Sequence, residues 1–327
     1  MSTKVELVNR NLHYDIMRVW ACLMVIFTHS PIPHVGWNGA FLSGLSYFCA
    51  PCIGFFIMVS GALLLDKQYA EGFDTKTFLQ KRASRVVWPT VIWSIIGITL
   101  SYFGIKNSEN AILWFMFTIV GLYLLTPILY RWISIAKKQE VEFYLLLWFV
   151  SLCYPYLKSL IHLNEGDTSL IYYFHGFVGY FILGYYLSKY ELSRAMSIGL
   201  LLAFSLFSIA LPILSYVWNL NVNFYSWFWY LSASVVLQCI IWWMFIKKIS
   251  NCLERGRNVI VFLSRYSFGI YLVHVLVLRN FLWKLSWIQV LSGYLQIIVC
   301  VVLTFAISLI ICWCISKLRV GKYVIGV

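Results

Sequence analysis

Three ionisable side chains lie within the first long apolar segment of the sequence. Asp15 and Arg18 are three residues apart, so on a helix they share a face and can pair. His29 follows Arg18 by eleven residues, close to three turns, which puts its imidazole near that face about 16 Å along the axis. Ionisable groups in a membrane are costly and by default mark a functional path. The alternative is that Arg18 snorkels to the membrane surface and His29 faces a loop.

A basic cluster follows the second long apolar segment and consists of Lys81, Arg82 and Arg85. Asp74 is predicted to cap the helix that carries this cluster toward the membrane from the cytoplasm. Arg82 and Arg85 are three residues apart, and two guanidiniums on one face suit phosphate recognition, because each offers a planar fork of donors. Alternatively, the cluster only sets membrane topology.

A polar stripe is predicted on a later apolar helix. Ser267, Tyr271 and His274 are spaced four and three residues apart, which places them on one helix face. Such a stripe either forms hydrogen bonds between helices or lines a pocket. Tyr123 and Trp114 are further polar groups in an earlier segment, where aromatic residues are more often structural.

The composition requires a membrane to position these residues. Of the 327 residues, 61% are apolar and 11% are charged, against about 25% charged in soluble domains. Apolar runs near the roughly 20 residues of a membrane span recur, so the sequence predicts a single all-α membrane domain over residues 1–327. The ten predicted spans are Tyr14–Ser30, Leu45–Leu65, Val86–Ile105, Ala111–Tyr130, Phe143–Leu157, Leu170–Leu187, Ala195–Val217, Phe224–Ile246, Tyr266–Leu278 and Val290–Ile315.

The charge distribution predicts the orientation. With these spans, 20 of the 25 Lys and Arg residues fall on one side, which places both termini in the cytoplasm. The opposite loops hold Lys106, Lys158, Arg279 and Lys284. Topology alone explains the net charge of +13, so nucleic acid is excluded as a partner, while an anionic small molecule or anionic lipid headgroups fit.

The chain resembles the acyltransferase-3 family of membrane O-acyltransferases. The family pattern of Arg, ten residues and His is matched by Arg18 and His29, and its Arg-x-x-Arg by Arg82 and Arg85. The motifs occur in the family's order over nearly the whole chain. Further matching segments are Phe55 to Gly61, Trp114 to Pro127, Gly179 to Tyr185, and Ser267 to His274.

The resemblance implies transfer of an acyl group, usually acetyl, from cytoplasmic acyl-CoA to a glycan hydroxyl on the outer face. Arg82 and Arg85, with Lys81, would hold the CoA phosphates, and His29 would act as general base. An acyl-His intermediate is the other mechanism that stays open. Asp15 would pair with Arg18 and fix its position. The predicted oxyanion-stabilising or sugar-binding residues are Ser267, Tyr271, His274, Tyr123 and Trp114.

The predicted partners are acetyl-CoA as co-substrate, a glycan acceptor and membrane lipids, with a homo-oligomer left open. No permanently bound cofactor is expected and no metal-ligand spacing occurs. The family is largely bacterial, which implies the bacterial cytoplasmic membrane. The competing class is a transporter or flippase for a lipid-linked glycan, or a non-catalytic membrane scaffold. A transporter would not depend on acyl-CoA. Transporters often contain repeated halves, and we see no such repeat in the sequence.

Overall fold

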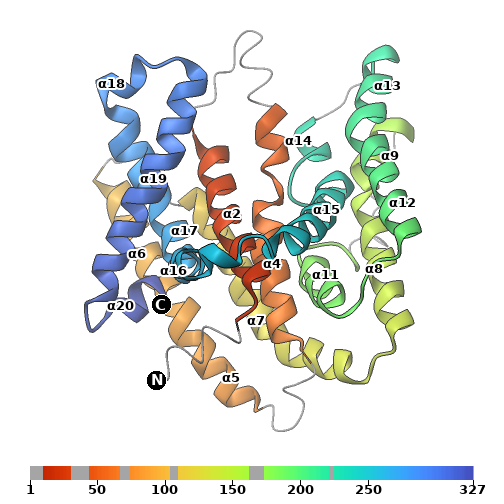
Figure 1. The fold of residues 1–327 in the computed structure, drawn as a ribbon, viewed down its shortest axis with the longest axis horizontal. Helices are drawn as coiled ribbons and strands as arrows, with labels where there is room; N and C mark the ends of the chain where they lie inside the picture. The colour runs from red at the N-terminus through yellow and green to blue at the C-terminus, as the bar shows by residue number, and fades with distance from the viewer. Residues whose placement is uncertain are drawn as a thin grey trace. The chain divides into compact units, whose positions relative to one another are not determined.

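The computed structural model describes residues 10–30, 44–66, 74–103, 110–161, 173–220 and 224–326, and within these ranges it contains helices and no strands (Figure 1). The predicted all-α fold is confirmed. The chain forms two compact units. Unit 1 comprises residues 1–52, 72–125 and 249–327, and unit 2 comprises residues 53–71 and 126–248.

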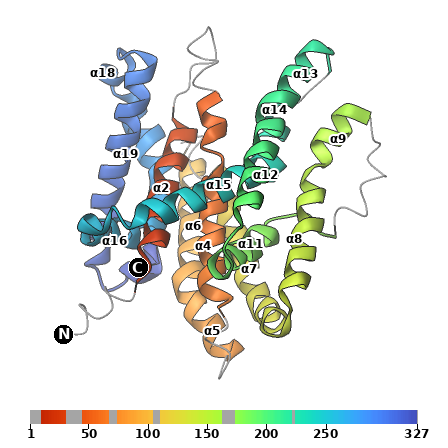
Figure 2. The same cartoon turned by 45° about the vertical axis from the view of Figure 1, so that its right-hand side comes forward.

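Unit 1 is built around α2, α17 and α19, whose mutual contacts join segments far apart in the sequence. Figures 1 and 2 show α2 and α19 as neighbouring elongated helices of this unit. Its elements are α2 (Leu12–His29), α5 (Thr75–Arg82), η2 (Ala83–Val87), α6 (Trp88–Tyr102), the first part of α7 (Asn110–Ile135), η5 (Glu254–Gly256), α16 (Arg257–Arg265), α17 (Ser267–Val275), η6 (Leu276–Phe281), η7 (Leu282–Lys284), α18 (Ser286–Gln289), α19 (Gly293–Ser316) and α20 (Gly321–Ile325).

Local signals set the ends of the helices that carry candidate residues. The side chain of Asn11 accepts a hydrogen bond from the His13 N–H at 3.1 Å and caps α2. The Asp74 carboxylate accepts the Thr77 N–H at 2.9 Å directly before α5, so the predicted cap is confirmed.

Unit 2 contains helices joined by close backbone contacts. A Cβ added to Gly61 would overlap the backbone of Phe181, and one added to Gly184 would overlap the backbone of Met58. The two glycines therefore let α4 and α11 touch along their backbones, as small residues do in membrane helix packing. The elements are α4 (Pro51–Leu64), the end of α7, α8 (Lys138–Leu152), α9 (Tyr154–Ile161), α11 (Val178–Lys189), α12 (Arg194–Ser205), η4 (Leu206–Ala210), α13 (Leu211–Val217), α14 (Phe224–Trp227) and α15 (Ala233–Ser250).

Six helices among the described residues are long and apolar enough to cross a membrane, or up to eight if each of two bent pairs forms one span. The six are Gly44–Leu64, Thr75–Tyr102, Leu113–Ile135, Arg194–Val217, Ala233–Ser250 and Gly293–Ser316. The bent pairs are Lys138–Leu152 with Tyr154–Ile161 and Glu254–Arg265 with Ser267–Lys284. The predicted spans Tyr14–Ser30 and Leu170–Leu187 correspond to α2 and α11, which are outside this set, so the count of ten stays a prediction.

The predicted span Phe224–Ile246 is not one continuous helix. Four residues form α14, and the chain turns helical again only at Ala233. The Tyr156 hydroxyl donates to the Trp227 carbonyl at 2.6 Å, and the Tyr180 hydroxyl donates to the Tyr230 carbonyl at 2.6 Å. These bonds satisfy backbone groups that a helix would otherwise satisfy, which is what non-helical backbone at membrane depth requires.

Three π-helical segments interrupt the helices of the described chain. A proline ring clashes with the carbonyl four residues earlier and has no N–H to donate. Pro89 stands four residues after Arg85 in η2, and Pro212 stands four residues after Ser208 in η4, so a wider turn relieves both clashes. The third segment, η6, has no proline after it.

Candidate functional site

All eleven predicted site residues lie in unit 1, although they come from widely separated parts of the chain. The helix α2 carries Asp15, Arg18 and His29. The segment from α5 to η2 carries the basic cluster, α7 carries Trp114 and Tyr123, and α17 carries the polar stripe. The fold thus gathers these elements, which come from residues 1–52, 72–125 and 249–327, into one compact unit.

Two contacts place α2 and α17 side by side and parallel. The Cys22 thiol donates to the Ser267 carbonyl at 3.3 Å. Seven residues farther along each helix, the rings of His29 and His274 lie 5.5 Å apart between centroids and are tilted by 43°. The structure therefore brings together two histidines that the sequence assigned to different clusters.

The surroundings of His274 define its tautomer. Its Nδ1 lies 2.5 Å from the Tyr271 carbonyl oxygen, which can only accept, so Nδ1 carries the hydrogen. In the neutral ring, Nε2 then has a free lone pair. The side chain is fully buried, and Nε2 has no hydrogen-bond partner among the described residues. In this state His274 can accept a proton, whereas donation from Nε2 to an oxyanion would require its protonated form.

The predicted polar stripe faces protein. Ser267, Tyr271 and His274 are 5%, 4% and 0% exposed, but their apolar neighbours on α17 are buried as well, so burial alone does not distinguish the stripe. Tyr271 packs edge-to-face on Phe115 at 5.1 Å between centroids, and Phe115 in turn contacts Trp114. Phe115 thus lies between Trp114 and Tyr271 and contacts both rings. Phe115 was not among the predicted site residues.

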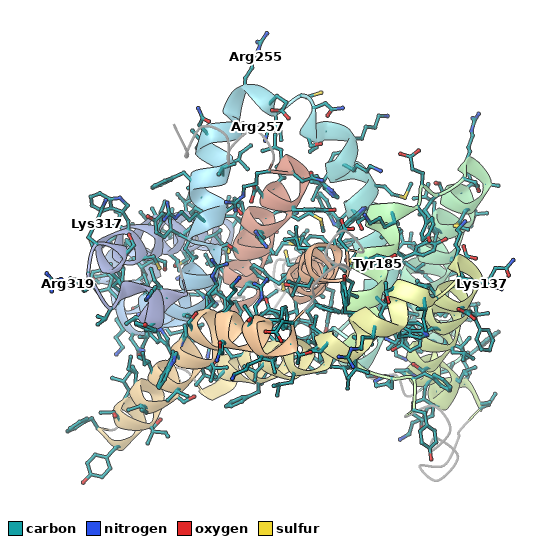
Figure 3. All side chains as sticks on the ribbon, turned by 90° about the horizontal axis from the view of Figure 1, so that it is seen from below. Lys137, Tyr185, Arg255, Arg257, Lys317 and Arg319 are labelled. Carbon is teal, nitrogen blue, oxygen red and sulfur yellow. The ribbon has the colours of Figure 1, made fainter. Side chains whose placement is uncertain are left out.

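Asp15 lies in a buried polar network at the start of α2. Its carboxylate is 1% exposed and accepts from Arg10 Nη2 at 2.8 Å and from the Ser264 hydroxyl at 2.6 Å. The predicted bridge to Arg18 is present but longer, at 3.9 Å. Arg257 donates to the Arg10 carbonyl at 2.8 Å, which joins α16 to the same network. Figure 3 shows Arg257 close to α2, whereas Arg255 points away from the ribbon. Asp15 therefore anchors α16 on α2 in addition to facing Arg18.

Arg82 lies against two aromatic rings. Its guanidinium is 5.5 Å from the ring centroids of both Phe78 and Tyr123, within the range of a cation–π interaction. Arg18 interacts electrostatically with both Arg82 and Tyr123. Tyr123 thereby links the basic cluster to α2, on the part of the helix that is far from His29.

The basic cluster departs from the regular helical face expected from its spacing. Arg82 ends α5, whereas Arg85 lies in η2, where hydrogen bonds close over five residues instead of four. Arg85 and Lys81 are exposed, while Arg82 is half-buried. The two arginines therefore lie on either side of the change from an α-helix to a π-helix and differ in burial.

Several residues of the site escaped the sequence analysis. Arg10 precedes the first predicted span and reads as one of the positive charges of the cytoplasmic side, and Ser264 carries no signal because its partner Asp15 is 249 residues away. Arg279 was counted as a loop charge, but it lies in η6 and its charge acts on both His29 and His274. The spacing of five residues between His274 and Arg279 would predict that the two lie close only if the helix between them were known to contain a π-turn.

The fold and this site define a multi-pass helical membrane protein whose polar and charged groups converge within one unit. Among the described residues, no group of three His, Cys, Asp or Glu side chains is placed to hold a metal ion. The family model of the acyltransferase-3 family, described as an acyltransferase domain, matches residues 11–316. The chain therefore belongs to the acyltransferase-3 family, which supports membrane acyl transfer. No curated protein and no solved structure gives a significant match.

Proposed function

We propose that the protein transfers an acetyl group from cytoplasmic acyl-CoA to a hydroxyl of a cell-surface or lipid-linked glycan. The observation that carries the proposal is the pairing of half-buried His29 with His274, whose Nε2 lone pair is free. Family membership supports the acyl transfer itself. The transporter alternative gains no comparable support.

The acyl-CoA would bind near the end of α2 that is far from His29. Arg82 on its aromatic platform, with Arg85 and Lys81 exposed nearby, offers cations suited to the CoA phosphates. Arg18 lies close enough to interact electrostatically with Arg82. The distance from Arg18 to His29 along α2 is about 16 Å. The pantetheine arm would follow this path, so that the thioester reaches the histidine pair.

In the proposed reaction, His29 takes the proton of the acceptor hydroxyl as the hydroxyl oxygen attacks the thioester carbonyl carbon. The tetrahedral intermediate then expels the CoA thiolate, which recovers the proton from the His29 imidazolium. The products are the glycan ester and free CoA. His274 would hold its tautomer through Tyr271 and accept a hydrogen bond at Nε2 from the acceptor or from His29. Attack by His29 on the thioester, to give an acyl-His intermediate, is the competing order of steps.

The setting of the reaction follows from the resemblance and the charge distribution. The protein would lie in the bacterial cytoplasmic membrane with ten spans and both termini in the cytoplasm. Its segment Leu263-Ser-Arg-Tyr-Ser-Phe-Gly-Ile-Tyr271 resembles the O-acetyltransferase of enterobacterial common antigen, and on this resemblance we propose a surface glycan as acceptor. The bilayer lipids would be permanent neighbours, and self-association stays a prediction.

The test is acetyl-CoA binding and hydrolysis by purified protein in detergent, with CoA release followed by mass spectrometry. His29→Ala should lower hydrolysis by about 10²- to 10⁴-fold, the usual contribution of a general base. His175→Ala, which changes a half-buried histidine in unit 2, serves as the matched control and should keep wild-type turnover.

The donor site is tested by CoA affinity. Arg82→Gln should weaken acetyl-CoA binding more than Arg85→Gln does, because Arg85 is exposed and, among the described residues, no aromatic ring forms a cation–π contact with it. Full turnover by His29→Ala would remove His29 from the mechanism. Folded wild-type protein that binds no acetyl-CoA would favour the transporter class instead.

A further inference from the structure

The segment after the buried histidine contains polar groups with no partner. Arg279 Nε and Asn280 Nδ2 are buried atoms without a hydrogen-bond partner among the described residues, and His274 Nε2 shares this property. No carboxylate of the described chain forms an ion pair with Arg279. An unpaired guanidinium in a membrane protein is costly and points to function.

The wide turn of η6 brings these groups together. In an α-helix, a residue five positions after His274 would point about 140° away from it. The hydrogen bonds of a π-helix join residues five apart, and η6 begins at Leu276, two residues after His274, so its wider turn reduces the angle between His274 and Arg279 below about 140°. Proline explains η2 and η4 but cannot explain η6, and π-bulges occur frequently at functional sites.

The position of Arg279 relative to the histidine pair indicates which ligand it meets. The positive charge of Arg279 acts on both His29 and His274. Because α2 and α17 run parallel, Arg279 lies about 7.5 Å beyond His274 in the direction away from Asp15. That is the end opposite to Arg82, and it faces the side from which the acceptor would arrive.

We propose that Arg279, Asn280 and His274 form an anion-binding site beside His29 that holds a carboxylate or phosphate group of the acceptor. The guanidinium fork matches either group with two parallel hydrogen bonds. The Asn280 amide adds a donor. The His274 lone pair accepts from a neighbouring hydroxyl of the same acceptor. That the bound anion belongs to the acceptor rests on the proposed function, whereas the existence of the anion site does not.

The experiment measures protection of His29 from carbethoxylation by diethylpyrocarbonate, scored on the His29 peptide by mass spectrometry in purified protein. The probes are sodium glucuronate, inorganic phosphate, neutral methyl glucoside and sodium chloride at matched ionic strength. Glucuronate or phosphate should slow modification of wild-type His29, while methyl glucoside and chloride should not. Which of the two anions protects at lower concentration separates a carboxylate-bearing from a phosphate-bearing acceptor.

Arg279→Gln should raise the half-protecting concentration of the anion about 10- to 100-fold, as expected for loss of a charged hydrogen-bond partner. The half-protecting concentration for Arg279→Lys should lie between those of wild type and Arg279→Gln, because lysine keeps the charge and lacks the planar fork of donors. The matched control is Lys284→Gln, which removes an exposed cation five residues later and should behave as wild type.

Equal protection by chloride and by the anions in wild-type protein would overturn the site without any variant. Unchanged protection in Arg279→Gln would do the same. The measurement needs no acyl-CoA and no turnover. Anion protection without acetyl-CoA hydrolysis would therefore reject the proposed function and keep the site, and hydrolysis without protection would do the reverse.

Discussion

Replacing Gly61 by Ala should destabilise unit 2 by forcing α4 and α11 apart. The new Cβ would lie well inside the 3.0 Å limit that real Cβ contacts essentially never cross, against backbone atoms of Phe181 that cannot rotate away. Overpacking typically costs about 1–3 kcal/mol, and a backbone obstacle places this site near the upper end. Alanine returns about 1 kcal/mol of helix propensity, which leaves a net loss of about 2 kcal/mol.

The control is Gly199→Ala on α12, where an added Cβ meets nothing within 4 Å. This change should stabilise the protein by up to about 1 kcal/mol. Thermal unfolding in detergent should then show a Tm lower by about 3 °C for Gly61→Ala, because the unfolding entropy scales with the 327 residues of the chain, and a Tm unchanged or slightly higher for Gly199→Ala. Gly184→Ala separates the same two helices, so the double variant with Gly61→Ala should lose less than the two single losses added together. A Gly61→Ala protein as stable as wild type would refute the reasoning.

Three further predictions concern the buried polar groups and the aromatic platform. Tyr123→Leu should weaken acetyl-CoA binding by about 3- to 30-fold in a calorimetric titration, because the aromatic ring beside Arg82 is lost. Tyr123→Phe keeps the ring and should bind acetyl-CoA as wild type does. Weaker binding in both variants would assign the effect to the hydroxyl. Asp15→Asn should lower unfolding stability in detergent by about 1–3 kcal/mol, because Arg10 and Arg18, which are partly exposed, lose their buried anionic partner. Asp74→Asn at an exposed cap should hardly shift the Tm, and equal shifts in the two variants would contradict this. Tyr156→Phe should lower the free energy of unfolding by about 1–2 kcal/mol, because the buried carbonyl of Trp227 loses the Tyr156 donor. An unchanged Tm would show that the Ser234 hydroxyl satisfies this carbonyl alone.

Local patterns predicted the parts of the site that depend on one helix. The spacing of Asp15 and Arg18 gives an ion pair, and Asp74 caps α5, because both interactions span a single turn. The pairing of His29 with His274 joins residues 245 apart, and no local pattern encodes such a contact. The shorter bond from Arg10 to Asp15 was also missed, because Arg10 lies before the helix and reads as a tail charge.

Helix geometry limited the prediction of the cationic residues. The shared face of Arg82 and Arg85 was predicted from an unbroken α-helix, and Pro89 was the sequence signal that the helix contains a wider turn. That the two arginines share a face stays a prediction. Arg279 offered no such signal, because nothing in the sequence marks η6 as a widened turn. The predicted span Phe224–Ile246 likewise failed at a break that tyrosine hydroxyls stabilise from other helices.

The widened turn η6 also has a consequence for comparing this chain with other members of its family. A π-turn holds one residue more than the α-turn it replaces, so deleting one residue between Leu276 and Leu278 would restore a regular helix. Arg279 would then stand four residues after His274 in an α-helix, about 40° around the axis from it, so the loss of one residue together with the widened turn would keep Arg279 near the histidine face. A family member with a one-residue gap at this place should therefore still be able to present a cation to the histidines, and only a change of the residue that aligns with Arg279 should remove the charge.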